Sequence, residues 1–311
     1  MKICMIGLGS IGKRHLGNLV SELERRKIQY QIDALRSTRS ALPEKWSGII
    51  NKQYYHMGEL PEDYDIAFIT NPTSLHYDTI RKIVNKTKHM FIEKPVFDSL
   101  NYNISELGLK QDNIYYVACP LRHKSIMKHV KKIVEEDKVI SARIISSSYL
   151  PAWRKGVDYR QVYSARKDLG GGVTRDLIHE WDYACYLFGK PDNVMHMSGH
   201  LSGLEIDSDD LSIYIARYPD MLLEMHLDYI GQRTERSLQL FTNSKRLDVD
   251  LIANTICEYG NNELKHKLNF PEEDFYRNEM EYFLDCIEER KENMNTVEEA
   301  YTALKIALTG E

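Results

Sequence analysis

Residues 2–26 read KICMIGLGSIGKRHLGNLVSELERR, and this stretch decides the fold. The apolar run Lys2–Ile6 predicts a strand, and the amphipathic run that follows predicts a helix over Gly12–Arg26. Between them lies Gly7-Leu8-Gly9-Ser10-Ile11-Gly12, a G-x-G-x-x-G motif. A strand before this motif and a helix after it are typical of the first turn of a dinucleotide-binding fold.

Each glycine of this motif has a separate task. We expect Gly7 to permit the tight turn, Gly9 to let the backbone approach a pyrophosphate, and Gly12 to allow close packing of helix on strand. The amides of Ser10 and Ile11 would add the partial positive charge of a helix N-terminus. The motif therefore predicts these five residues as cofactor contacts, with a ligand-free glycine turn as the alternative.

The second predicted strand, Gln31–Leu35, bears on which dinucleotide binds. If it ends at Leu35 or Arg36, then Arg36, Ser37 and Thr38 occupy the place of a 2′-phosphate, which favours NADP. If it ends two residues earlier, Asp33 faces the ribose hydroxyls, which favours NAD. We expect NADP, with NAD as the alternative.

The alternation of short apolar runs with helical segments continues to about residue 120. It predicts βαβ units and a parallel sheet, that is, a Rossmann domain over residues 1–120. The other predicted strands of this domain are Ile66–Thr70, Met90–Ile92 and Ile114–Ala118, and its other predicted helices are Ser74–Asn85 and Ser99–Leu109.

From about Ile140 the pattern changes to consecutive runs with period-2 alternation. Such runs without intervening helices predict a largely antiparallel, open-faced sheet in an α/β domain over residues 121–311, for substrate binding and oligomerisation. Tyr218-Pro219-Asp220 is a plausible hairpin turn within it. Helices would cover this sheet or return to the first domain, at His123–Glu136, Asp176–Phe188, Asp274–Arg290 and Val297–Leu308.

Composition narrows the class of protein. The net charge of −5 over 311 residues gives no electrostatic reason to expect a nucleic-acid partner. The five cysteines are scattered singly, which argues against a disulfide framework and a structural zinc site, and no metal is expected. No apolar stretch approaches the roughly 20 residues that span a bilayer, and no signal-like region precedes the first strand. We therefore expect a cytoplasmic protein without a membrane partner.

Two further predicted strands end in polar clusters. Ile66–Thr70 runs into Asn71-Pro72-Thr73-Ser74-Leu75-His76, and Met90–Ile92 runs into Glu93-Lys94-Pro95. Ligands of an open parallel sheet bind at the carboxyl ends of its strands, so these clusters should converge on the cofactor. The predicted contacts are Asn71, Pro72, Thr73, His76, Glu93 and Lys94.

Four motifs of the chain resemble, in order and spacing, those of the Gfo/Idh/MocA oxidoreductases, the family of glucose–fructose oxidoreductase and inositol dehydrogenase. The motifs are Gly7–Gly12, Asn71–His76, Glu93-Lys94-Pro95, and Gly170–Gly172 followed by His179-Glu180-Trp181-Asp182. The resemblance implies an NAD(P)-dependent enzyme acting on the CH–OH groups of sugars. It implies that Lys94 binds the substrate hydroxyl and assists proton transfer, with His179 as acid/base partner, and that the Lys94–Pro95 bond is cis. It also implies that Trp153 and Arg154 reach the cofactor.

One position departs from the family pattern. Many members carry an Asp four residues before the histidine, where this chain has Arg175, and Asp176 lies three before. Asp176 and His179 would still share one helix face, so Asp176 could orient His179 or bind a substrate hydroxyl. The alternative is a carboxylate that only stabilises a helix N-terminus.

A cluster of cations and aromatic residues precedes the glycine run. Arginine offers bidentate donors and tyrosine stacks on sugars, so the cluster could bind a carboxylate or phosphate; a surface loop of mixed charge is the alternative. Its members are Tyr159, Arg160, Tyr163 and Arg166, with Arg122 added. The stretch is similar to family members of bacterial surface saccharide pathways, which implies an anionic or nucleotide-activated sugar.

Other functions of the same fold stay open. One is a redox-recycling lyase or glycosidase, in which hydride returns to the substrate, and another is a non-catalytic NAD(P) sensor. We also expect a homodimer or homotetramer, because the exposed apolar face of an open sheet commonly packs against a second copy of the chain. Burial of that face against helices of the same chain would explain the period-2 apolar pattern equally well.

Overall fold

The computed structural model describes residues 1–310, which form two compact units. Unit 1 comprises Met1–Pro120 and Asp274–Tyr301, and unit 2 comprises Leu121–Glu273 and the chain from Thr302 onwards. The first division falls at residue 120. The expected continuous second domain is interrupted, because residues 274–301 return to unit 1.

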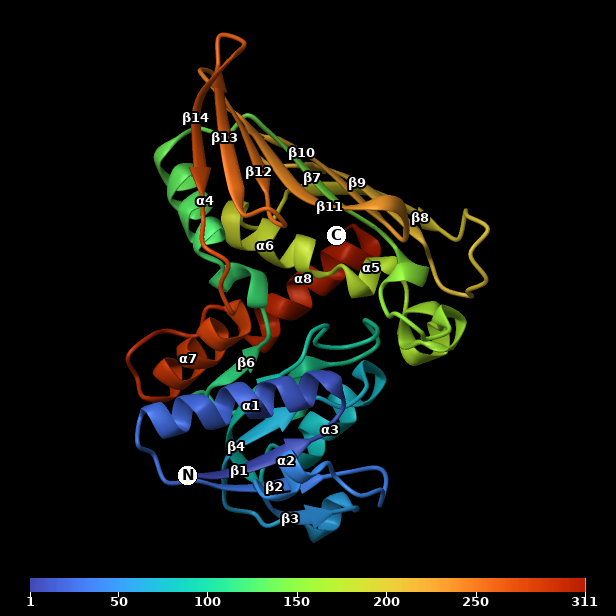
Figure 1. The fold of residues 1–311 in the computed structure, drawn as a ribbon, viewed down its shortest axis with the longest axis vertical. Coiled ribbons are helices and arrows are strands. Elements are labelled where there is room, and N and C mark those ends of the chain that lie inside the picture. The colour runs from blue at the N-terminus through green and yellow to red at the C-terminus, as the bar shows by residue number, and fades with distance from the viewer. Residues whose placement is uncertain (311) are drawn as a thin grey trace. The chain divides into compact units, whose positions relative to one another are not determined.

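Unit 1 contains a parallel sheet in the order β3-β2-β1-β4-β5-β6 (Figure 1). This strand order is that of a doubly wound dinucleotide-binding fold, so the predicted Rossmann domain is confirmed. The strands are β1 (Lys2–Ile6), β2 (Gln31–Leu35), β3 (Ile50–Tyr54), β4 (Tyr64–Ile69), β5 (Thr87–Ile92) and β6 (Tyr115–Val117), and the helices within residues 1–120 are α1 (Ser10–Arg25), α2 (Glu44–Ser47) and α3 (His76–Ile83).

Three elements of unit 1 differ from the prediction, and one of them is the four-residue helix α2, which was not expected. The edge strand β3 was not expected, because three polar residues interrupt its apolar ends. The predicted helix Ser99–Leu109 is only the 3₁₀ turn Ile104–Leu107. The Asn103 side chain accepts a hydrogen bond from the Ser105 amide, 3.1 Å away, and Gly108 ends the turn with a φ of +71°. Side-chain bonds of this kind compete with a longer helix.

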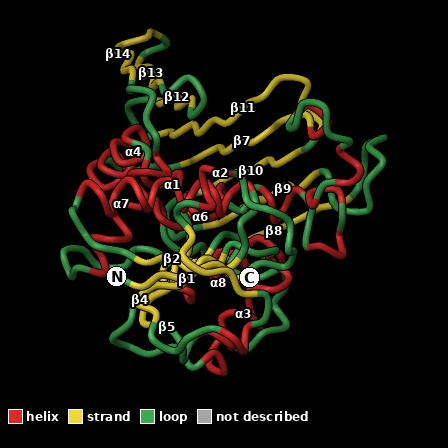
Figure 2. Tube along the Cα trace, turned by 60° about the horizontal axis from the view of Figure 1, so that its bottom comes forward, coloured by secondary structure: helices red, strands yellow, loops and turns green. Residues whose placement is uncertain are grey.

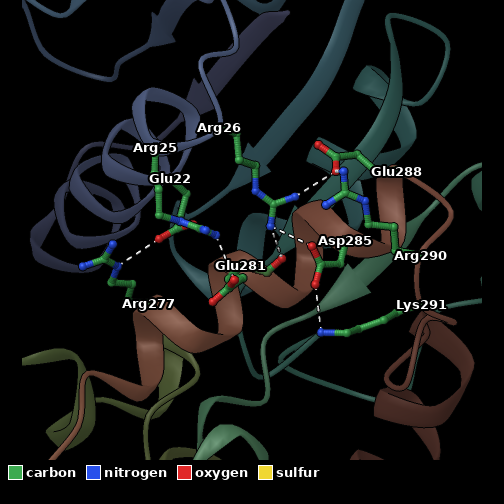
Figure 3. A network of polar contacts seen from close by, with 9 residues as sticks. All are labelled: Glu22, Arg25, Arg26, Arg277, Glu281, Asp285, Glu288, Arg290 and Lys291. Atoms are coloured by element: carbon green, nitrogen blue, oxygen red, sulfur yellow. Dashed lines mark hydrogen bonds and ion pairs between the residues drawn. The ribbon is translucent and has the colours of Figure 1, made fainter.

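Helix α7 (Phe275–Ile287) explains why the chain returns to unit 1. Its Phe283 packs edge-on against Phe68 and Phe91 of the sheet, with ring centroids 5.9 and 5.2 Å apart. Figure 3 shows the network of ion pairs between the end of α1 (Glu22, Arg25 and Arg26) and α7 with the residue after it (Arg277, Glu281, Asp285 and Glu288). Within the same network, Arg290 pairs with Glu288 and Lys291 with Asp285.

Unit 2 contains a sheet in the order β14-β13-β12-β11-β7-β10-β9-β8, antiparallel except between β10 and β7. Among the described residues, helices lie on one face of it, and the strands run side by side in Figure 2. The strands are β7 (Ser141–Tyr149), β8 (Asn193–Gly199), β9 (Leu211–Arg217), β10 (Leu222–Asp228), β11 (Ile230–Phe241), β12 (Arg246–Asp250), β13 (Thr255–Gly260) and β14 (Glu263–Asn269), and the helices are α4 (Ser125–Glu136), α5 (Val173–Asp176), α6 (His179–Phe188) and the second half of α8 (Val297–Thr309).

The largely antiparallel sheet is as predicted, and so is its hairpin turn, which the Tyr218 amide closes on the Met221 carbonyl at 2.9 Å. Strands β8, β13 and β14 were not predicted. Every residue of β14 is exposed. Because neither face of this strand is buried, its sequence lacks the alternation of apolar and polar residues by which a strand is predicted. No helix within residues 1–310 has the length and apolar character to cross a membrane.

Candidate active site

The glycine turn after β1 is as tight as its sequence predicts. Gly7 has a φ of +94°, and a Cβ there would lie 2.8 Å from the Asn71 amide nitrogen. A Cβ on Gly12 would lie 2.3 Å from the Gly7 carbonyl oxygen. Thr70 closes the turn by donating its hydroxyl to that same oxygen at 2.6 Å. Only glycine fits at these two positions.

Gly9 differs from both, because a Cβ there would have no atom within 4 Å. This open space lies before the first residue of α1, a helix of 16 residues with no acidic side chain in its first turn. Such a helix N-terminus offers free amides and partial positive charge to an anion. The residues present therefore fit a dinucleotide pyrophosphate.

The end of β2 bears on the choice between NADP and NAD. The strand ends at Leu35. Asp33 is 1% exposed and accepts a hydrogen bond from the Tyr64 hydroxyl at 2.9 Å, so it belongs to the core. Arg36 follows the strand and donates to Gln53 at 2.6 Å and to Ser40 at 3.2 Å. Ser37 and Thr38 are exposed beside it.

His76 joins the polar loops that follow β4 and β5. Its Nε2 lies 3.0 Å from the Asn71 carbonyl oxygen, and its Nδ1 lies 3.1 Å from that of Pro95. The ring is 1% exposed, and burial lowers the pKa of His76. The ring thus links the two loops, and its direct contact with a cofactor stays a prediction.

Glu93 is also buried, directly before Lys94. One carboxylate oxygen bonds to His15 Nε2, and the other accepts the Lys94 amide at 3.1 Å. Burial alone would raise the pKa of Glu93, but the hydrogen bond from His15 and the charges of His15, Lys94 and His76 outweigh it and lower the pKa. The Lys94–Pro95 peptide is cis, as the resemblance implied.

In unit 2 the predicted helix Asp176–Phe188 is broken. Helix α5 ends at Asp176, α6 begins at His179, and a turn lies between them. The expectation that the two side chains share one helix face is therefore wrong. His179 is half-buried at the first position of α6.

Asp176 instead accepts a hydrogen bond from the hydroxyl of Tyr229, at 2.6 Å. Burial and the Asp176 carboxylate raise the pKa of Tyr229 well above its ordinary value, so the phenol keeps its proton and remains a donor. The Tyr229 ring packs edge-on against Trp153, with centroids 5.1 Å apart. Sequence reasoning missed Tyr229, whose only signal was its place at the end of a period-2 run.

The loop after β7 carries most of the other predicted substrate and cofactor contacts. Trp153 donates its indole N–H to Ser148 at 2.9 Å, and Arg154 is exposed. A small hollow brings several of these residues together, lined by Leu150, Pro151, Trp153, Arg154, Val157, Tyr159, Val162 and Ser164.

Two arginines of the predicted cation cluster form ion pairs with carboxylates of the same chain. Arg122 is 6% exposed and binds Asp182 through two nitrogens, at 3.0 and 2.8 Å. Arg160 pairs with Asp158 at 2.9 Å and Glu205 at 3.0 Å, and is exposed.

The two tyrosines of the cluster have partners too. The Tyr163 hydroxyl donates to the Gly170 carbonyl at 2.7 Å, and the Tyr159 hydroxyl accepts the Glu205 amide at 3.1 Å. The sequence could not reveal the contacts with Asp182 and Glu205, because these partners lie 45 or more residues further along the chain.

Comparisons with known proteins agree with the class that the fold and the glycine turn define, a protein with an NAD-type Rossmann unit. Residues 1–107 match the model of the GFO_IDH_MocA oxidoreductase family with an NAD-binding Rossmann fold. Residues 1–107 of this chain are thus similar to the Rossmann unit of the Gfo/Idh/MocA family, which confirms the resemblance of the motifs within them.

Individual relatives are more distant. The uncharacterized oxidoreductase YrbE of Bacillus subtilis is 27% identical over 63% of this chain and 56% of its own length. Myo-inositol 2-dehydrogenase of Thermotoga maritima is 28% identical over 61% of this chain and 55% of its own length. The chain thus matches little more than half the length of these relatives.

The fold similarity extends over both units. The structure of UDP-N-acetylglucosamine 3-dehydrogenase GnnA of Acidithiobacillus ferrooxidans has a TM-score of 0.79 and 16% identity, and the match covers 100% of this chain and 96% of that protein.

Proposed function

We propose that this protein is an NADP-dependent oxidoreductase that transfers hydride between the nicotinamide and a secondary hydroxyl or ketone of a sugar or sugar derivative. One observation carries the proposal. The open glycine turn at the end of β1 and Lys94 at the end of β5 lie at the same edge of one parallel sheet. That edge is where open α/β sheets bind their ligands.

The residues would divide the chemistry as follows. A nicotinamide cofactor held at the glycine turn would supply the group that accepts or donates the hydride. Lys94 binds the substrate hydroxyl and moves its proton, a task suited to a lysine fixed by a buried neighbour. His179 is the acid/base partner in unit 2, and Asp176, held by Tyr229, binds a further hydroxyl of the substrate.

The substrate class rests on relatives and on the loop after β7. Relatives in the comparisons act on an inositol and on a nucleotide-activated sugar, and both are polyhydroxylated rings. An anionic or nucleotide-activated sugar remains our proposal, with Arg160 as a contact, while Arg154 is proposed to reach the cofactor. Arg160 can serve because its ion pairs are exposed, and water screens such pairs strongly.

Lys94→Ala tests the central role. We expect the variant to bind NADPH normally and to lose turnover by at least about a hundredfold, the usual scale for removing an acid/base group. Cofactor binding is measured by fluorescence titration, and turnover by absorbance with candidate sugars and cyclic polyols. Near-normal turnover would remove Lys94 from the mechanism. Binding of neither NADPH nor NADH to the native protein would overturn the proposed function.

Arg36→Ala tests the cofactor assignment. We expect the affinity for NADPH to fall by about tenfold or more, the scale of a lost charge-assisted hydrogen bond, while the affinity for NADH stays unchanged. Lys88→Ala is the matched control, since Lys88 is an exposed cation near the opposite end of β5. An equal loss for both cofactors would contradict the 2′-phosphate role.

A further inference from the structure

His15 is a buried titratable residue of unit 1 that the proposed mechanism does not use. It lies on the inner face of α1 and is 0% exposed. Its ring packs against Phe91, with centroids 4.7 Å apart, and against Tyr276, at 6.1 Å. In these surroundings an apolar side chain would avoid the cost of burying a polar ring.

The polar contacts of His15 all point to one neighbour. Its Nε2 bonds to Glu93, whereas its Nδ1 has no hydrogen-bond partner among residues 1–310. A buried polar atom without a partner costs free energy, so packing alone does not account for a histidine here. The hydrogen bond to Glu93 is therefore the interaction that accounts for a histidine at this buried position.

That bond continues to the proposed catalytic lysine. Glu93 holds His15 with one carboxylate oxygen and the Lys94 amide with the other, at 3.1 Å. With both oxygens bound, the carboxylate cannot rotate without losing a hydrogen bond. A line of contacts therefore runs from α1, the helix that begins at the glycine turn, to the backbone of Lys94.

We propose that His15 is a positioning residue for Lys94 and acts through the Glu93 carboxylate. The inference rests on the proposed function, because it assigns a further residue to the same site. His15 fixes the orientation of Glu93 and keeps that carboxylate charged, and Glu93 in turn holds the Lys94 amide and places a negative charge beside the lysine. Without His15, the buried carboxylate loses its strongest partner.

Two substitutions separate positioning from packing. His15→Phe keeps an aromatic ring against Phe91 and Tyr276 and removes the hydrogen-bond donor. His15→Gln keeps a donor near the position of Nε2. We expect His15→Phe to bind NADPH within about twofold of the native protein and to lose about tenfold or more in kcat, the scale of one charged hydrogen bond. His15→Gln should recover most of kcat.

The pH profile gives a readout that packing would not move. The titratable groups around Glu93 are His15 on α1, His76 on α3, Tyr276 on α7 and the adjacent Lys94. Burial raises the pKa of Glu93, and His15 lowers it through its hydrogen bond and charge. The pKa of Glu93 should therefore rise when His15 is removed. The acid limb of kcat should therefore shift to higher pH in His15→Phe and stay in place in His15→Gln.

Amide hydrogen exchange at Lys94 tests the inference without any turnover. We expect faster exchange in His15→Phe and native exchange in His15→Gln, because the Lys94 amide needs the fixed carboxylate as acceptor. Native exchange at Lys94 in His15→Phe would overturn the positioning role. A native protein that binds no dinucleotide would instead overturn the proposed function, so the two failures are distinguishable.

Discussion

Gly9 and Gly12 lie three residues apart, yet the same substitution meets different surroundings at each. A side chain at position 9 enters open space, whereas a Cβ at position 12 meets the Gly7 carbonyl at 2.3 Å. We expect Gly9→Val to leave the thermal midpoint unchanged and to abolish NADPH binding, because the side chain fills the space that a pyrophosphate needs. Gly12→Val should destabilise the protein by about 1–3 kcal/mol, the scale of overpacking.

Thermal denaturation and an NADPH titration on both variants check this contrast. Retained affinity in Gly9→Val would contradict the phosphate role. Gly58→Val is the control, since it also enters open space, in a turn away from the motif.

At the same scale, the site residues predicted from sequence were those within local motifs. The glycine turn and Lys94 can be recognised from the residue spacing of their motifs, because each motif is formed by residues that are close in sequence. His15 and Tyr229 could not be found in this way, since their partners Glu93 and Asp176 lie on other elements. The same holds for the bond of Arg122 to Asp182, which lies 60 residues further along the chain.

Among the elements, α7 makes contacts with α1 that its own sequence does not reveal. Arg26 of the α1 C-terminus donates to the Glu281 carbonyl, to Asp285 at 2.7 Å and to Glu288 at 3.0 Å, and its side chain is 9% exposed. Arg25 pairs with Glu281 at 2.8 Å, but both side chains are about half exposed.

We therefore expect Arg26→Met to lower the free energy of unfolding of unit 1 by about 2 kcal/mol, the scale of hydrogen bonds to charged groups. Arg25→Met should cost less than about 1 kcal/mol, because an exposed pair contributes little. Thermal denaturation measures both. Equal midpoints for the two variants would show that the network in Figure 3 does not hold α7 in place.

The periodicity of the sequence predicted five of the parallel strands and the long helices, because each has a buried apolar face. It could not predict the break between α5 and α6, where Leu177 and Ile178 are as apolar as the helices around them. Nor could it predict β8, whose Met195 and Met197 face solvent.

At the scale of the whole molecule, that exposure bears on assembly. Met195 lies opposite Ile215, and Met197 opposite Ile213, on the outward face of β8 and β9. All four side chains are between 41% and 80% exposed, and among residues 1–310 no helix of unit 2 covers this face in Figure 1. Contiguous apolar surface of this kind marks an interaction site, and identical chains most often pair through one shared face.

We therefore predict a homodimer or homotetramer formed through this face, and Ile215→Glu should dissociate it by placing a charge in a dry interface. Leu264→Glu is the matched control, because Leu264 is 52% exposed on β14, at the other end of the same sheet. Sedimentation at micromolar concentration should give an oligomer for the native protein and for Leu264→Glu, and a 36 kDa monomer for Ile215→Glu. A native protein that sediments as that monomer would contradict the prediction, and dissociation by both variants would move the interface away from β8 and β9.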